Sequence, residues 1–357
     1  MPGSEQDIIT PLKLYHEIEA APSIEALREL GSRMLDTVGC VITVPVDEKS
    51  IVRMIARVNS AITRRIIALM ETVEGISLPA GAAFLALGSE GRGEQTLRTD
   101  QDSAIVYPDS FSAEQIEQVN RFANRLVDAL EATGVPRCPG NVMASNPRWC
   151  HSIGEWKQLL EEWITAPTHE NILDFCLFQD LSALHGNESL CTELRDHIRT
   201  MVRLPPFFFP NMACHATRFP SPLTFFGRIR VERSGEYRGL VDIKKSGIFA
   251  ITVGASLLAL EAGVVGGNTW DKLALLGQRK IVTAGDLKRI EGAFSFLVRL
   301  RIQSQLRELA VDKVPTNYVD PQGMTGAERE RFKTALKGID CFLRVIRNRY
   351  MLDFISG

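Results

Sequence analysis

The chain has 357 residues, a length that exceeds one ordinary hydrophobic core and predicts two domains. Apolar residues make up 45% of it and charged residues 24%, the proportions of a soluble globular protein. The formal net charge of −2 gives no reason for tight binding to nucleic acid or to a membrane surface, so we expect neither as a partner.

The seven cysteines are scattered and none forms a CxxC pair. Without a signal peptide, this pattern predicts reduced thiols in the cytoplasm. The most apolar stretch, residues 248–265, is interrupted by Thr252, Ser256 and Glu261. It predicts a buried helix, because a membrane span needs about 20 mostly apolar residues.

Two amphipathic helices are predicted first along the chain. Ser23 is a candidate N-cap for a helix whose apolar side chains recur at helical spacing as far as Val38. A second helix is expected from about residue 48 to 72, with one apolar stripe from Ile51 to Leu69. We expect both to brace the domain that follows.

The most informative stretch is FLALGSEGRGEQTLRTDQDSAIVY, residues 84–107. A short buried strand ends at a Gly88-Ser89 turn, and a polar loop then leads to Asp100, Asp102 and a second apolar strand. On an extended chain the two carboxylates share a face, where they repel each other unless a cation lies between them. Such ligands suit Mg²⁺, with Mn²⁺ as the alternative ion. Small residues and free backbone N–H groups at Gly88 and Ser89 would let a triphosphate lie close to the main chain.

A helix is predicted next, because Ser112 and Gln115 form a capping box and the helical pattern stops at Gly134. Residues 135–150 have the composition of a loop. Ser152 and Glu155 then open another helix, and one more helix ends near Met201.

A proline-rich linker at residues 203–222 marks a domain boundary. Beyond it we expect a β pair formed by residues 226–232 and 239–243. Helices are expected at 246–262, 269–277, 284–309 and 325–354, as in a helical bundle. The predicted division is an N-terminal helical segment (1–75), an α/β domain (76–205) and a helical domain (206–357).

The strand–Gly-Ser–loop–Asp-x-Asp pattern resembles the nucleotidyltransferase signature of the polymerase-beta superfamily. Within it, GSEGRGEQTLRTDQDSAIVY is similar to a nucleotidyltransferase family related to the N-terminal domain of bacterial PII uridylyltransferases. Further matching blocks cover most of the chain: CPGNVMASNPRWC (138–150), FFGRIRVE (225–232), DIKKSGIF (242–249) and LVRLRIQSQL (297–306).

The resemblance implies an α+β fold, with a polymerase-beta-like catalytic domain between N-terminal helices and a C-terminal helical substrate-binding domain. Asp100 and Asp102 would hold Mg²⁺ on the phosphates of ATP or UTP, and NMP would pass to a hydroxyl with release of pyrophosphate. The acceptor implied is a protein, in signal transduction.

A third carboxylate in the resembling superfamily comes from a later strand, and the matching position is Asp180. The resemblance therefore favours a strand at residues 171–184, with Cys176, Phe178 and Asp180 on one face. A helix is the alternative. The chain departs from the family pattern nearby, where an Arg-like position is Ser182 and Gly-Asp is replaced by Gly186-Asn187.

Other residues are candidates for contact with the nucleotide. Arg92 is expected either to bind phosphate or to order the loop against Glu94. Gln95 and Thr96 are weaker candidates, because polar loop residues often bond only to the backbone. Lys244 and Lys245, at the start of a predicted helix, would reach the triphosphate or remain solvated.

Two other functions stay open. One is a nucleotide-binding regulatory module that has lost catalysis, which the changes at Ser182 and Asn187 would permit. The other is a nucleotidyltransferase that acts on a small molecule, with the same chemistry and a different acceptor.

Overall fold

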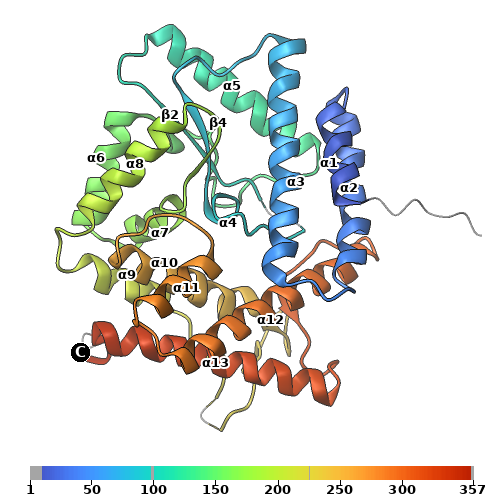
Figure 1. The fold of residues 1–357 in the computed structure, drawn as a ribbon, viewed down its shortest axis with the longest axis vertical. Coiled ribbons are helices and arrows are strands. Elements are labelled where there is room, and N and C mark those ends of the chain that lie inside the picture. Colours follow the sequence, from blue (N-terminus) through green and yellow to red (C-terminus); the bar gives the residue numbers. More distant parts are fainter. Residues whose placement is uncertain (1–9, 98–99, 225, 355–357) are drawn as a thin grey trace, which may run out of the picture. The chain divides into compact units, whose positions relative to one another are not determined.

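The computed structural model describes residues 10–97, 100–224 and 226–354 (Figure 1). Residues 98, 99 and 225 of the motifs quoted above lie outside this range. Contacts between residues define two compact units, one of Met1–Lys157 with Leu181–Leu194 and the other of Gln158–Asp180 with Arg195–Gly357. This division differs from the three predicted segments, because residues 158–180 group with the C-terminal part of the chain.

Three helices open the first unit: α1 (Pro11–Ala20), α2 (Ile24–Val41) and α3 (Glu48–Leu69), which a short π-helix, η1 (Met70–Glu74), extends. Ser23 caps α2 as predicted, accepting a hydrogen bond from the Ala26 N–H. The predicted apolar stripe of α3 is buried along its whole length.

A four-stranded mixed sheet forms the core of the first unit. Its strands are β1 (Ala83–Ala86), β2 (Ser103–Tyr107), β3 (Cys150–Ser152) and β4 (Ser182–Gly186), in the spatial order β3-β2-β1-β4. β1 runs antiparallel to β2 and β4, whereas β2 and β3 are parallel. Every residue of β1 and β2 is buried, which agrees with their uninterrupted apolar sequences.

Helix α5 (Ala113–Ala132) follows β2 and begins at the predicted capping box, both halves of which are formed. A 3-10 turn, η2 (Pro147–Trp149), precedes β3, and α6 (Ile153–Thr165) follows it. The Trp156 indole N–H donates to the Ile105 carbonyl oxygen at 2.9 Å, which ties the start of α6 to β2.

The strand favoured for residues 171–184 is wrong over its first part. Helix α7 (His169–Phe178) occupies it, because Thr168 caps the helix and Ile172, Phe175 and Phe178 are buried at helical spacing. The strand begins only at Ser182, as β4, and α8 (Glu188–Met201) comes next.

The second unit is mainly helical, as predicted. Its further helices are α9 (Phe208–Ala216), η3 (Lys244–Ile248), α10 (Phe249–Glu261), α11 (Thr269–Gln278), α12 (Ala284–Leu309), α13 (Gly326–Tyr350) and η4 (Leu352–Phe354).

The predicted β pair is only partly correct. β5 (Val241–Asp242) pairs with β6 (Tyr318–Val319), a segment that the short-range pattern could not identify. None of the described helices is long and apolar enough to cross a bilayer.

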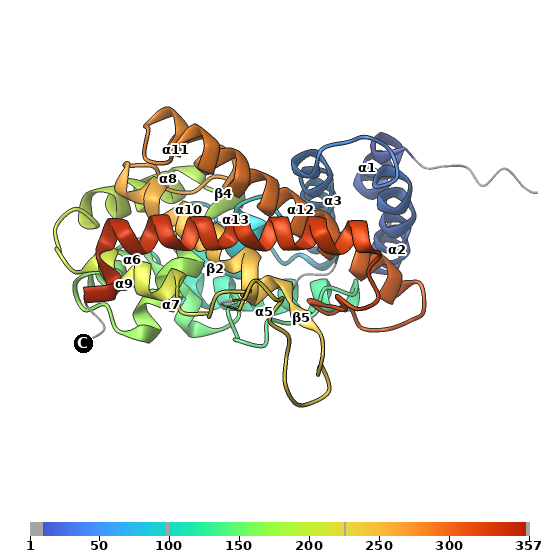
Figure 2. The ribbon, with the colours of Figure 1, turned by 90° about the horizontal axis from the view of Figure 1, so that it is seen from below.

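Helices α12 and α13 pack side by side, and α13 is the long red helix of Figure 2. A Cβ atom at Gly338 of α13 would lie 2.6 Å from the Arg289 carbonyl oxygen of α12. The two backbones can therefore approach closely only because residue 338 has no side chain.

We expect Gly338→Ala to lower the free energy of unfolding by about 1–3 kcal/mol, because the added methyl group overpacks this contact. Gly292→Ala is the matched control, since a Cβ there meets no atom within 4 Å. That change should stabilise α12 by about 0.5–1 kcal/mol. Urea unfolding of both variants measures the difference, and equal effects would contradict close helix packing at Gly338.

Candidate active site

The candidate site lies where β1 ends. After Leu87 the chain turns at Gly88, whose φ of +51° falls in the left-handed region that favours glycine. A Cβ atom at Gly88 would lie 3.0 Å from Asp102 Oδ2, and the Leu87 N–H donates to the Asp102 carbonyl oxygen at 2.9 Å. The Gly-Ser turn therefore packs directly against Asp102, the residue that precedes β2.

The loop after the turn is held by its own contacts. Residues Gly88–Gly91 form one helical turn, α4, and the Glu94 N–H donates to the Ser89 carbonyl oxygen at 2.9 Å. Arg92 and Glu94 form an ion pair at 2.9 Å, with side chains only 15% and 5% exposed. Arg92 thus orders the loop against Glu94, which is one of the two roles expected for it.

Gln95 and Thr96 belong to the same loop, and both side chains are buried. The Gln95 carbonyl oxygen Oε1 accepts a hydrogen bond from the Asn59 amide of α3 at 3.1 Å, and Thr96 is 2% exposed. Gln95 also lines a small cavity beside Asp102. The bond to Asn59 fixes the loop to α3.

Asp100 and Asp102 come together with Cys138. One potential ligand atom from each of these half-buried residues lies within 4.8 Å of the other two. Two carboxylates at this separation have the donor chemistry that Mg²⁺ and Mn²⁺ prefer. Burial and the negative charge of Asp102 raise the pKa of the Cys138 thiol to about 12, so the thiol is protonated at neutral pH.

Sequence reasoning missed two members of this site. Cys138 is the first residue of the CPGNVMASNPRWC block, but its place beside the carboxylates depends on contacts over more than 30 residues. Glu90 is the third residue of the GSEG motif and lines the cavity that Asp102 also lines. Burial and the charge of Asp102 raise the pKa of the Glu90 carboxyl to about 7.

Two family models match the sequence. One, described as "Putative nucleotidyltransferase DUF294", matches residues 32–170, and the other, described as "Putative nucleotidyltransferase substrate binding domain", matches residues 206–350. The chain belongs to this nucleotidyltransferase family. The match confirms the resemblance found in the sequence and the polymerase-beta-like α+β fold. No curated protein matches the sequence.

Asp180, the predicted third metal ligand, has contacts of its own within the second unit, and its role toward the metal stays a prediction. It follows α7 in the second unit, and its carboxylate accepts a 2.5 Å hydrogen bond from the Lys272 ammonium. Both side chains are 2% exposed, and Lys272 also donates to the Ser256 hydroxyl at 2.7 Å. These contacts give Asp180 a structural role in the core of the second unit.

The departures from the family pattern have local explanations. Ser182 is the first residue of β4 and pairs with Ala86 of β1. Asn187 accepts hydrogen bonds from the N–H and the hydroxyl of Ser189 at 3.1 and 2.7 Å, at the start of α8. Both residues therefore fit the observed backbone.

Lys244 and Lys245 lie at the start of η3 in the second unit. The Lys245 N–H donates to the Asp242 carboxylate at 2.9 Å, and its ammonium lies 3.7 Å from the same carboxylate. The Lys245 side chain is 60% exposed. Contact of these lysines with a triphosphate stays a prediction.

The Glu90 carboxyl should make stability depend on pH. Because its pKa is raised from 4.5 to about 7, the folded protein loses stability as pH rises through this window. With divalent cations chelated, Glu90→Gln should therefore be more stable than the wild type at pH 8, by about 1–3 kcal/mol, and gain much less at pH 5. Urea unfolding at both pH values tests this. Glu117→Gln, at an exposed position of α5, is the control, and a gain for Glu90→Gln that is equal at both pH values would contradict it.

Breaking the Asp180–Lys272 pair should destabilise the second unit. Lys272→Met leaves a buried carboxylate without its cation, at a loss of about 3–5 kcal/mol. Adding Asp180→Leu should recover much of this loss, because the buried charge is then removed. Lys333→Met, which breaks an exposed ion pair with Glu330, should change stability by less than about 1 kcal/mol. Similar urea midpoints for Lys272→Met and Lys333→Met would show that the buried pair contributes no more to the free energy of unfolding than the exposed pair.

Proposed function

We propose that this protein is a Mg²⁺-dependent nucleotidyltransferase that transfers NMP from ATP or UTP to a hydroxyl group, with release of pyrophosphate. The observation that carries the proposal is the position of Asp102, which stands beside Asp100 and directly against the Gly88 turn. This is the arrangement that the family signature requires, on a chain that two models of that family match.

Each residue of the site has a distinct part in the proposed reaction. Asp100 and Asp102 would hold the cation, which would supply positive charge to neutralise the phosphates and the departing pyrophosphate. Gly88 and Ser89 let the phosphates approach the main chain, because no bulky side chain intervenes. The Arg92–Glu94 ion pair keeps the loop in this shape.

The acceptor hydroxyl has to lose a proton as it attacks the α-phosphorus. A base works best when its pKa lies near the working pH. The Glu90 carboxyl, whose pKa is raised in the metal-free protein, lines the cavity that Asp102 also lines, whereas the Asp180 carboxylate is paired with Lys272. We therefore assign the proton-accepting role to Glu90 within this proposal.

The proposed acceptor is a protein, and the proposed setting is signal transduction in the cytoplasm. The support is the resemblance to PII uridylyltransferases, together with the match of residues 206–350 to a substrate-binding domain. Lys244 and Lys245 belong to this region and are proposed to contact the phosphates.

The test is transfer of label from each α-³²P-labelled NTP, with Mg²⁺, to proteins of a host-cell lysate. We expect label on one acceptor with ATP or UTP, and a loss of about 100-fold or more in Asp100→Asn/Asp102→Asn. Asp36→Asn/Asp312→Asn removes two exposed carboxylates and should keep full activity.

Other outcomes would redirect the assignment. Label on a small molecule alone would replace the protein acceptor with a small one. Metal-dependent NTP binding without any transfer would favour the regulatory module. Equal labelling by the two double variants would remove Asp100 and Asp102 from the reaction.

A further inference from the structure

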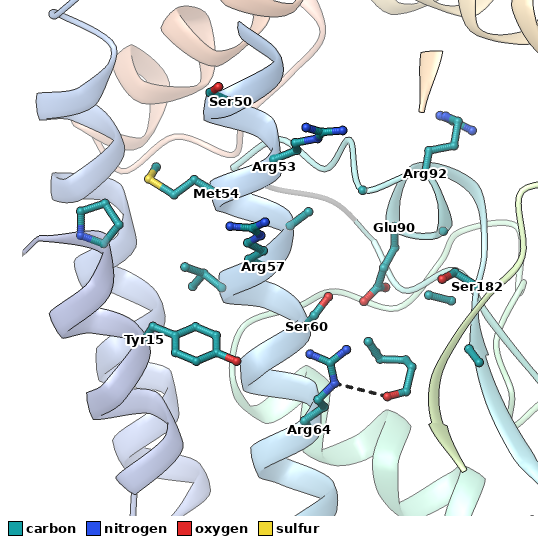
Figure 3. Close-up of a pocket in the computed structure, with 18 of the residues that line it drawn as sticks. Tyr15, Ser50, Arg53, Met54, Arg57, Ser60, Arg64, Glu90, Arg92 and Ser182 are labelled. Carbon is teal, nitrogen blue, oxygen red and sulfur yellow. Dashed lines mark hydrogen bonds between the residues drawn. The ribbon is translucent and has the colours of Figure 1, made fainter. Parts of the chain in front are cut away.

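A second and larger pocket lies in the first unit, on the side of α4 that faces α3 (Figure 3). Its volume is about 1250 Å³, enough for a ligand of nucleotide size. Residues of α1, α3, the Gly-Ser loop and β4 line it, and of the site residues described above it includes Glu90 and Arg92. Asp100 and Asp102 are not among the lining residues.

Arginines dominate the charge of this pocket. Arg53, Arg57 and Arg64 come from α3, at spacings of four and seven residues that place them on one face of the helix. Arg92 is already paired with Glu94. Among the described lining residues, Glu90 supplies the one carboxylate, so the pocket has an excess of positive charge.

The side chains of these three arginines are exposed, so their guanidinium groups are accessible from the open pocket. The Arg64 Nε–H donates to the Leu184 carbonyl oxygen at 3.4 Å, which holds one guanidinium in the pocket. Arg57 forms no hydrogen bond or ion pair with any residue that the structure describes. Figure 3 shows the Tyr15 hydroxyl on the flank of α3 toward α1 and the Ser60 hydroxyl on the flank toward Glu90, as further donors around the space.

Several donors of one charge around a concave space favour an anion with several oxygens. Guanidinium groups bind phosphate through two parallel hydrogen bonds, and hydroxyl groups complete the contacts. We propose that this pocket binds a small molecule carrying two or more phosphate groups, independently of the Asp100–Asp102 pair. This is a second ligand site, and it goes beyond the transfer reaction proposed above.

Calorimetric titration of the full-length protein in EDTA tests the proposal, because the carboxylate pair then has no divalent cation. Pyrophosphate and ATP are titrated separately. We expect one saturable site, weakened at least tenfold in Arg57→Gln/Arg64→Gln and also by added salt. Tighter binding of ATP than of pyrophosphate identifies a nucleotide ligand, and equal binding shows that the phosphates suffice.

Two matched variants keep the test sharp. Arg28→Gln/Arg121→Gln removes the same charge from exposed helix positions outside the pocket, and Asp100→Asn/Asp102→Asn disables the proposed reaction. Both should bind like the wild type. Absence of saturable binding, equal weakening by the two arginine pairs, or loss of binding in the aspartate variant would each overturn the proposal. Since no turnover is measured, these results do not depend on whether the protein transfers NMP.

Discussion

The turn at Gly88 forms only because nothing larger than a hydrogen atom stands between it and the Asp102 carboxylate. A side chain there would meet Asp102 Oδ2 at 3.0 Å and would also have to adopt a φ of +51°. The backbone hydrogen bond from the Leu87 N–H to the Asp102 carbonyl oxygen holds the same two segments together. The loop, the carboxylates and the buried strands β1 and β2 thus form one rigid arrangement, on which any chemistry at this site depends.

Short-range patterns predicted much of the fold. The capping boxes, the apolar stripe of α3 and the two buried strands each depend on residues only a few positions apart, so the sequence shows them directly. The sequence does not show the pairing of β5 with β6 directly, because about 75 residues separate the two strands. Residues 171–178 form a helix where the family resemblance favours a strand, because the Thr168 cap and the helical spacing of the buried side chains determine the local structure.

The site residues also fall into those that the sequence predicts and those that only the folded chain brings together. Asp100, Asp102 and Gly88 could be identified because their chemistry lies within one motif of 20 residues. Cys138 and Lys272 could not be placed, since each meets its partner only through the folded chain. Glu90 was visible in the motif, but its raised pKa depends on burial that no local pattern indicates.

The course of the chain has a consequence for dissecting this protein. The chain changes unit at residues 157, 180 and 194, so no single cut separates the two units. A fragment ending near residue 205 would retain α7 but lose Phe208, whose ring packs edge-on against the Phe175 ring with 4.9 Å between the ring centroids. It would also lose Lys272, the partner of Asp180. It would expose an apolar helix face and a buried carboxylate together. Such a fragment should be prone to aggregate, and the catalytic part should be studied within the whole chain.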